Sequence, residues 1–277
     1  KLYDYVSKGW VSFSTPVWAN FGLGRGLPIS CFGSYIGDDM AEIAFTHAEN
    51  TMMSKYGGGT SGYFGALRAR GAEIKNNGTS NGPVHFMQMF ETLIHVVSQG
   101  KVRRGSFSPY LPVEHPDIMD FLEIGTEGNP IQNMTHAVTV GDEWLQSMVD
   151  GDEAKRAIWA KIIQRRGELG YPYIMYTGNA NKNTVDVYKD KDLKIVASNL
   201  CSEIMLPSNE NWSFVCCLSS VNLLHYDAWK DSDLIEVMVK LLDAVITDFC
   251  ERLESLRDSE EKSKRQAFLF MERAYNF

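Results

Sequence analysis

The sequence has few cysteines, five in 277 residues, and no two of them form a Cys-x-x-Cys pair. An odd count at this low density is untypical of small secreted domains that depend on disulfides. No cleavable signal pattern opens the chain. We therefore expect a reducing, cytoplasmic setting, where a cysteine is either buried and inert or chemically reactive.

Basic charge is also scarce. The chain has 27 basic and 35 acidic residues, a net charge of −8 and a pI of about 5.3. Because binding to nucleic-acid phosphates needs clustered Lys and Arg, this balance argues against a nucleic-acid partner. Long apolar runs are missing as well: the richest stretch, residues 234–249, contains Glu236, Lys240, Asp243 and Asp248. It is too polar for a membrane span of about 20 apolar residues, so we expect no membrane partner.

Several catalytic signatures do not occur, namely GxxxxGK[ST], HExxH and GxSxG. The six histidines are scattered without ligand spacing, so we expect no metal site. The glycines of residues 57–62 only loosely resemble a phosphate-binding turn, and we interpret them as a loop.

Predicted helices and strands alternate along the chain. This alternation favours an α/β fold with parallel strands joined by crossover helices. Strands are expected at residues 11–15, 28–36, 63–68, 137–140, 171–176, 195–197 and 214–218. Helices are expected at residues 1–8, 38–56, 83–98, 117–124, 142–149, 153–168 and 231–255, and again near the end of the chain.

The most informative segment is residues 198–207, SNLCSEIMLP. If it is extended, Asn199, Cys201 and Glu203 project to the same side, because side chains alternate along a strand. The amide can hold a hydroxyl, the carboxylate can take a proton, and the thiol can act as a nucleophile or a hydrogen-atom carrier. A buried inert Cys201 between a solvated Asn199 and Glu203 is the alternative.

Two further strand-like segments contain cysteines, Cys31 in one and Cys216 with Cys217 in the other. Adjacent strand residues face opposite ways, so only one of Cys216 and Cys217 can point into a shared site. One thiol from each segment makes a two-electron redox pair beside Cys201 if the Cα atoms lie within about 7 Å.

These residues resemble the ribonucleotide reductase large (catalytic, alpha) subunit family. The resemblance rests on residues 198–207 followed by residues 214–223, FVCCLSSVNL, and covers essentially the whole chain. Residues 14–16 (STP), 30–31 (SC) and 98–103 (SQGKVR) match the family in the same order. The implied fold is the first part of its ten-stranded α/β barrel, with the radical cysteine on a central loop.

The resemblance implies a role for each cysteine of the site. Cys201 would carry a transient thiyl radical and abstract the 3′-hydrogen of the ribose. Cys31 would help protonate the departing 2′-hydroxyl, and Cys31 and Cys216 would then supply electrons and close to a disulfide. The roles of Cys217 and Cys250 stay open.

Other substrate contacts follow from the same resemblance. Glu203 would take the 3′-hydroxyl proton, and Asn199 would hydrogen-bond the ribose hydroxyls. Thr15 and Ser30 would lie close to the nucleotide substrate, with Thr15 a candidate phosphate contact.

The family also has an allosteric specificity site for deoxynucleoside triphosphate effectors, with ATP a further effector of the family. Its matching residues are Asp38, Arg68, Gln99 and Arg103, where Arg103 matches the arginine that reads the substrate base. A solvated basic turn at residues 99–105 is the alternative.

Compared with the family, we expect residues 1–277 to be a partial, N-terminal portion of the catalytic barrel domain. The ATP-cone and the C-terminal half of the barrel are absent from the sequence. The expected partners are the complementing C-terminal part, a radical-generating small (beta) subunit with a dimetal-tyrosyl or metal centre, thioredoxin or glutaredoxin, and a second copy in a homodimer. No cofactor is expected to bind this chain directly.

Three alternatives remain. A class II reductase would use adenosylcobalamin with the same cysteines, in place of the class I chemistry on ribonucleoside diphosphates that the overall similarity favours. A cysteine hydrolase or transferase would use Cys201 as its nucleophile beside a histidine. A non-catalytic module would only sense deoxynucleotides.

Overall fold

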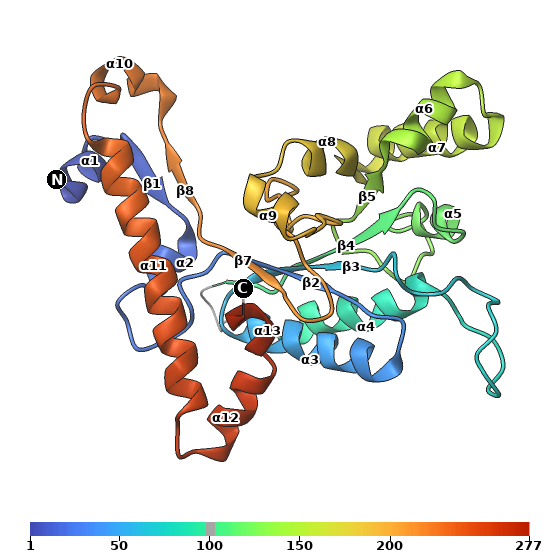
Figure 1. Cartoon of the computed structure of the whole chain (residues 1–277), viewed down its shortest axis with the longest axis horizontal. Helices are drawn as coiled ribbons and strands as arrows, with labels where there is room; N and C mark the ends of the chain where they lie inside the picture. The colour runs from blue at the N-terminus through green and yellow to red at the C-terminus, as the bar shows by residue number, and fades with distance from the viewer. Residues whose placement is uncertain (98–102, 277) are drawn as a thin grey trace.

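A six-stranded sheet lies at the centre of the part of the chain that the computed structural model describes, residues 1–97 and 103–276 (Figure 1). Its strand order is β6-β5-β4-β3-β2-β7. The strands are β2 (Cys31–Tyr35), β3 (Gly59–Tyr63), β4 (Phe107–Pro112), β5 (Ala137–Val140), β6 (Tyr173–Tyr176) and β7 (Phe214–Cys216). Together with the covering helices it confirms the predicted α/β class.

The strands β2 to β6 are all parallel, whereas β7 runs antiparallel to β2. The expectation of parallel strands is therefore right for β2 to β6. It is wrong for β7 and for the strand expected at residues 11–15, which pairs antiparallel with residues 219–221. For β7 the reason lies in the connection: after β6, at one edge of the sheet, the chain crosses to the opposite edge. It then enters β7 beside the end of β2, so that β7 runs back along it.

Two helices cover one face of the sheet. The helix α3 (Met40–Lys55) packs on β2 and β3, and α4 (Pro83–Val96) packs on α3 and β4. Asp39 is the N-cap of α3, and its carboxylate accepts a hydrogen bond from the Ala41 amide at 2.7 Å. Pro83 occupies the first turn of α4, where its missing N–H costs nothing. These elements enclose the larger apolar core, which includes Phe90 and Phe107.

A separate arm stands beside the sheet (Figure 1). It contains a two-stranded antiparallel ribbon of β1 and β8, a short helix α1 that contacts the long helix α11, and the connecting turns. From the end of α11 the chain returns through α12 to α13, which contacts β7. The bounds are α1 (Leu2–Ser7), β1 (Val11–Phe13), α2 (Thr15–Asn20), β8 (Ser219–Val221), η1 (Leu223–His225), α10 (Tyr226–Trp229), α11 (Leu234–Arg257), α12 (Lys262–Leu269) and α13 (Glu272–Tyr275).

The remaining helices connect or flank β4, β5, β6 and β7. They are α5 (Ile118–Phe121), α6 (Asp142–Asp150), α7 (Glu153–Leu169), α8 (Thr177–Lys182) and α9 (Asp186–Asp190). Among the residues with described positions, no helix is both long and apolar enough to cross a membrane.

Four local predictions are wrong, and one of them is the strand expected at residues 63–68, which overlaps β3 only at Tyr63. Residues 195–197 form no strand, and the strand β4 at Phe107–Pro112 was not predicted. The glycine cluster is not a loop, because residues 59–63 are the strand β3 itself. Packing explains the glycines: a Cβ at Gly62 would lie 2.7 Å from Ile36 Cδ1, and one at Gly58 would lie 2.1 Å from a ring carbon of Phe32.

Candidate active site

Cys31 and Cys216 are directly opposite each other in the antiparallel ladder of β2 and β7. Opposed residues of such a ladder have Cα atoms about 4.5–5.5 Å apart, within the range that a disulfide bridges. Both thiols are free and buried. Cys217, the alternative partner, lies on the other side of the strand, where its thiol contacts the Leu242 carbonyl at 3.6 Å.

The two thiols are electrostatically unequal. The hydrogen bond from the Cys216 thiol lowers the pKa of Cys31 from 9.0 to about 7, against the opposing effect of burial. The Asn199 amide and the positive charge of Arg103 lower it further. The same hydrogen bond, with burial, raises the pKa of Cys216. Cys31 is therefore the thiol of the pair that ionises first.

Asn199 connects this pair to the segment that contains Cys201. Its Nδ2 atom lies 3.4 Å from Cys31 Sγ and donates to Glu203 Oε1 at 2.7 Å. Its Oδ1 atom accepts from the Glu203 and Ile204 amides, each at 3.1 Å. Asn199 is fully buried, and its side-chain amide contacts both the Cys31 thiol and the Glu203 carboxylate.

Residues 198–207 are not extended throughout, and the condition under which their side chains would alternate fails at Asn199 to Ser202. Here the chain turns, with the Ser202 amide donating to the Asn199 carbonyl at 3.2 Å and Ser202 at φ 65°. Asn199 and Glu203 meet because Oδ1 of Asn199 closes this turn, not because their side chains alternate along a strand. Cys201 lies at the tip of the turn and is exposed in the chain.

Side chains of β3 and β4 anchor the turn by hydrogen bonds, and the sequence analysis did not single out these residues. The Tyr110 hydroxyl of β4 donates to the Asn199 carbonyl at 2.6 Å and contacts the Ser202 hydroxyl at 2.6 Å. The Ser61 hydroxyl of β3 donates to the Ser198 carbonyl at 2.8 Å. Pro109 and Pro112 argue against a strand at β4, and nothing local linked Tyr110 to residue 199.

Cys201 keeps its proton at neutral pH. Partial burial raises its pKa, and the neighbouring Glu203 carboxylate raises it further. A protonated thiol beside a carboxylate and an amide retains the hydrogen that a hydrogen-atom carrier needs.

Arg103, which the resemblance groups with the effector residues and matches to the arginine that reads the substrate base, lies near Cys31. Its Nη1 donates to the Ser30 carbonyl at 3.1 Å. Ser30 is buried, and its hydroxyl donates to the Ser14 hydroxyl at 2.8 Å. Thr15 follows Ser14 as the first residue of α2. The predicted substrate contacts Thr15 and Ser30 are therefore close in space through Ser14.

Asp38, after β2, and Arg68, after β3, lie together at a second site. The Arg68 Nε donates to Asp38 Oδ2 at 2.8 Å, and the Arg68 amide donates to Asp38 Oδ1 at 3.0 Å. Both residues line a pocket of about 240 Å³ that also includes Ile74 and Phe86. Gln99, the remaining predicted effector residue, lies outside the described residues.

Within residues 1–97 and 103–276, no group of three or more His, Cys, Asp or Glu side chains could hold a metal ion. Cys250, in α11, packs against the apolar cluster that contains Phe249 and Phe268.

The chain is similar to known proteins along most of its length. The sequence model of the family described as "Ribonucleotide reductase, barrel domain" matches residues 29–155 and 152–268. The chain belongs to the ribonucleotide reductase large-subunit family. The six-stranded sheet is accordingly part of the α/β barrel of that family.

Individual relatives are named as large or alpha subunits of such reductases. The putative ribonucleoside-diphosphate reductase large subunit of Frog virus 3 is 34% identical over 270 residues, 91% of this chain and 46% of the relative. The alpha subunit of Chlamydia trachomatis serovar D is 27% identical over 299 residues, 88% of this chain and 28% of the relative. The solved structure of the Actinobacillus ureae class Id ribonucleotide reductase alpha subunit is 50% identical, with a TM-score of 0.88, and covers 99% of this chain and 49% of that one. The chain thus spans about half the length of that alpha subunit, and less than half the length of the two relatives from Frog virus 3 and Chlamydia trachomatis.

Proposed function

We propose that the chain contains the reducing cysteines of a ribonucleotide reductase catalytic subunit, which converts ribonucleotides to 2′-deoxyribonucleotides. One observation carries the proposal: Asn199 contacts Cys31 and Glu203 together, while Cys31 is paired in register with Cys216. A hydroxyl-binding amide, a carboxylate and a dithiol are the groups that removal of a 2′-hydroxyl requires.

The proposed roles are those that the family resemblance implies, and the contacts around Asn199 support them. A thiyl radical at Cys201 removes the 3′-hydrogen, and Glu203 accepts the 3′-hydroxyl proton. Loss of the 2′-hydroxyl as water takes a proton from the Cys31–Cys216 pair. Overall, the C2′–OH bond breaks, a C2′–H bond forms, and the two thiols lose two electrons and two protons as they close to one disulfide. The 3′-hydrogen returns from Cys201, so its thiyl radical is regenerated.

In this proposal, a partner protein supplies the radical. Class I chemistry on ribonucleoside diphosphates is supported by relatives named ribonucleoside-diphosphate reductase subunits and by the class Id neighbour. The radical then comes from a small subunit, and a thioredoxin- or glutaredoxin-type dithiol reopens the disulfide. The chain also needs a complementing polypeptide to close the barrel.

A reductase assay tests this function. The chain is combined with the polypeptide that completes the barrel, a radical-generating subunit, a ribonucleoside diphosphate and a dithiol reductant. Wild type and Cys250→Ser should form deoxyribonucleoside diphosphate, and Cys201→Ser should form none. The matched control, Cys250, is a thiol of α11 that packs against the apolar cluster containing Phe249 and Phe268. Full activity of Cys201→Ser would overturn the proposal.

We also propose that the Asp38–Arg68 pocket binds a deoxynucleoside triphosphate effector. Support comes from the paired charges at the rim of an otherwise partly apolar pocket. Equilibrium dialysis with a labelled deoxynucleoside triphosphate should show weaker binding to Asp38→Ala than to wild type. The exposed Asp227 supplies the control substitution Asp227→Ala, which should bind as wild type does.

A further inference from the structure

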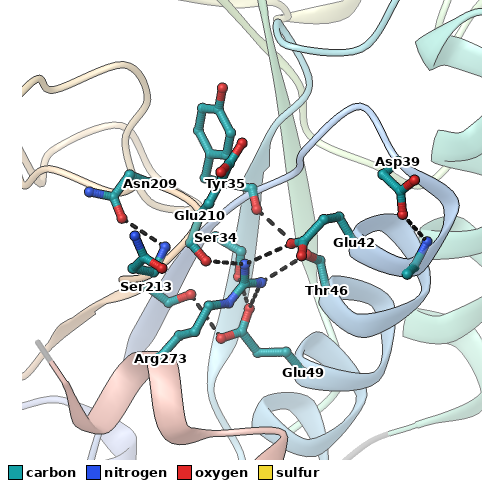
Figure 2. A network of polar contacts seen from close by, with 12 residues as sticks. Ser34, Tyr35, Asp39, Glu42, Thr46, Glu49, Asn209, Glu210, Ser213 and Arg273 are labelled. Atoms are coloured by element: carbon teal, nitrogen blue, oxygen red, sulfur yellow. Dashed lines mark hydrogen bonds and ion pairs between the residues drawn. The ribbon is translucent and has the colours of Figure 1, made fainter.

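A buried carboxylate lies behind the β2–β7 ladder, on the opposite side from the cysteine pair. Glu49 of α3 is fully buried. Its Oε2 atom accepts a hydrogen bond from the Ser34 hydroxyl of β2 at 2.8 Å. Its Oε1 atom accepts from the hydroxyl of Ser213, the residue before β7, also at 2.8 Å. One carboxylate therefore binds both strands (Figure 2).

The positions of the two serines continue the register of the cysteines. The ladder pairs Cys31 with Cys216, Phe32 with Val215 and Gly33 with Phe214. The next pair in the same register is Ser34 with Ser213. Because side chains alternate along a strand, these serines face α3 while the cysteines face the opposite side of the sheet. Glu49 thus links the two strands at the position that follows the last pair of the ladder, the ladder that orients the thiols.

Arg273 of α13 neutralises this carboxylate. Its Nη2 atom lies 2.9 Å from Glu49 Oε2 and 2.8 Å from Thr46 Oγ1, and its side chain is only 7% exposed. The Arg273 carbonyl also accepts a hydrogen bond from the Ser213 amide at 3.1 Å. Ser213 is therefore held through both its backbone and its hydroxyl, by residues from two different helices (Figure 2).

We propose that Glu49, with Arg273 as its counter-ion, is a positioning residue that sets the register of β2 and β7 and hence the approach of the Cys31 and Cys216 sulfurs. A strand of three residues has few backbone hydrogen bonds to resist a shift, and a one-residue slip would turn Cys216 to the other face. The inference rests on the proposed function in that it takes Cys31 and Cys216 to be the redox pair.

The test is the equilibrium of the full chain with oxidised and reduced dithiothreitol, with no nucleotide present. Two protein thiols lose two electrons and two protons, one disulfide forms in the protein, and the disulfide of dithiothreitol is reduced to two thiols. Differential alkylation followed by peptide mass spectrometry measures the fraction of Cys31 linked to Cys216.

Removing either hydroxyl should weaken disulfide formation. Ser213→Ala and Ser34→Ala should each lower the equilibrium constant at least threefold, and Glu49→Gln more strongly. Ser108→Ala is the matched control, because Ser108 is a fully buried strand serine whose hydroxyl has no hydrogen-bond partner among the described residues. It should leave the equilibrium constant unchanged. The serine variants keep the test valid if Glu49→Gln fails to fold.

Thermal unfolding of each variant separates positioning from general stability, since a folded variant with a purely structural defect melts earlier without a changed disulfide equilibrium. Equal equilibrium constants for wild type, Ser213→Ala and Ser34→Ala would overturn the positioning role and leave the redox pair intact. Failure of wild type to link Cys31 to Cys216 at all would overturn both the pair and its positioning.

Discussion

The Asn199 side-chain amide lies 3.4 Å from Cys31 Sγ, although the two residues are 168 positions apart in the sequence. This contact joins the redox-pair candidates on β2 and β7 to the turn that contains Cys201. The charge state of Cys31, the conformation of the turn and the packing of the β2–β7 ladder therefore depend on one another, and each can be tested separately.

The Cys31 pKa depends chiefly on Cys216. Since the hydrogen bond from Cys216 stabilises the Cys31 thiolate, Cys216→Ala should raise the Cys31 pKa from about 7 by about one unit or more. The carbon chemical shift of Cys31 Cβ in isotope-labelled protein, followed against pH, measures this value. Cys250→Ala serves as the control, and an unchanged Cys31 titration in Cys216→Ala would rule out the hydrogen bond as the cause.

Gly33 allows the Phe214 ring to lie across β2. A Cβ at Gly33 would be 2.0 Å from Phe214 Cζ, and Phe214 is buried, so Gly33→Ala must displace β7 from β2. We expect the free energy of unfolding in urea to fall by about 1–3 kcal/mol. Gly24→Ala, at a site with no atom within 4 Å, should change it little. Equal destabilisation by both substitutions would contradict the steric explanation.

Tyr110 supports the turn that contains Cys201. Tyr110→Phe removes one of the two donors to the Asn199 carbonyl and leaves the Ser202 amide, so we expect a loss of about 0.5–1.5 kcal/mol of stability. Amide hydrogen exchange at Cys201 and Ser202 should also become faster. Tyr3→Phe, at a residue that is 82% exposed, is the control. Unaltered exchange in Tyr110→Phe would show that the turn is stable without this anchor.

His136 makes the stability of the chain sensitive to acid. It is 1% exposed, between the rings of Phe121 and Tyr171, and burial lowers its pKa from 6.5 to about 4. The unfolded chain therefore binds a proton at this residue before the folded chain does. Its contribution to stability is complete above pH 6.5 and is lost as the pH falls towards about 4.

The test compares wild type with His136→Phe by urea unfolding at about pH 8 and about pH 5, where this residue alone should cost the wild type about 2 kcal/mol on acidification. His136→Phe should lack that part of the loss. Identical losses in the two proteins would show that His136 does not titrate between these conditions.

Local patterns were sufficient for much of the structure. The sequence predicted a helix at residues 38–56, where α3 lies, and a strand at residues 137–140, where β5 lies, because caps and side-chain patterns act within a few residues. The order of residues around Cys31, Cys201 and Cys216 was enough to identify the family.

Contacts between distant segments required the tertiary structure. Periodicity could not show that Cys31 is opposite Cys216, because register depends on how strands from separate parts of the chain pack. Nor could it show that Asn199 closes a turn or that Arg273 meets Glu49 across 224 positions. The sequence by itself determined which chemical groups and local elements the chain has; packing and burial alone decided which of those groups meet, at what distance and in which protonation state.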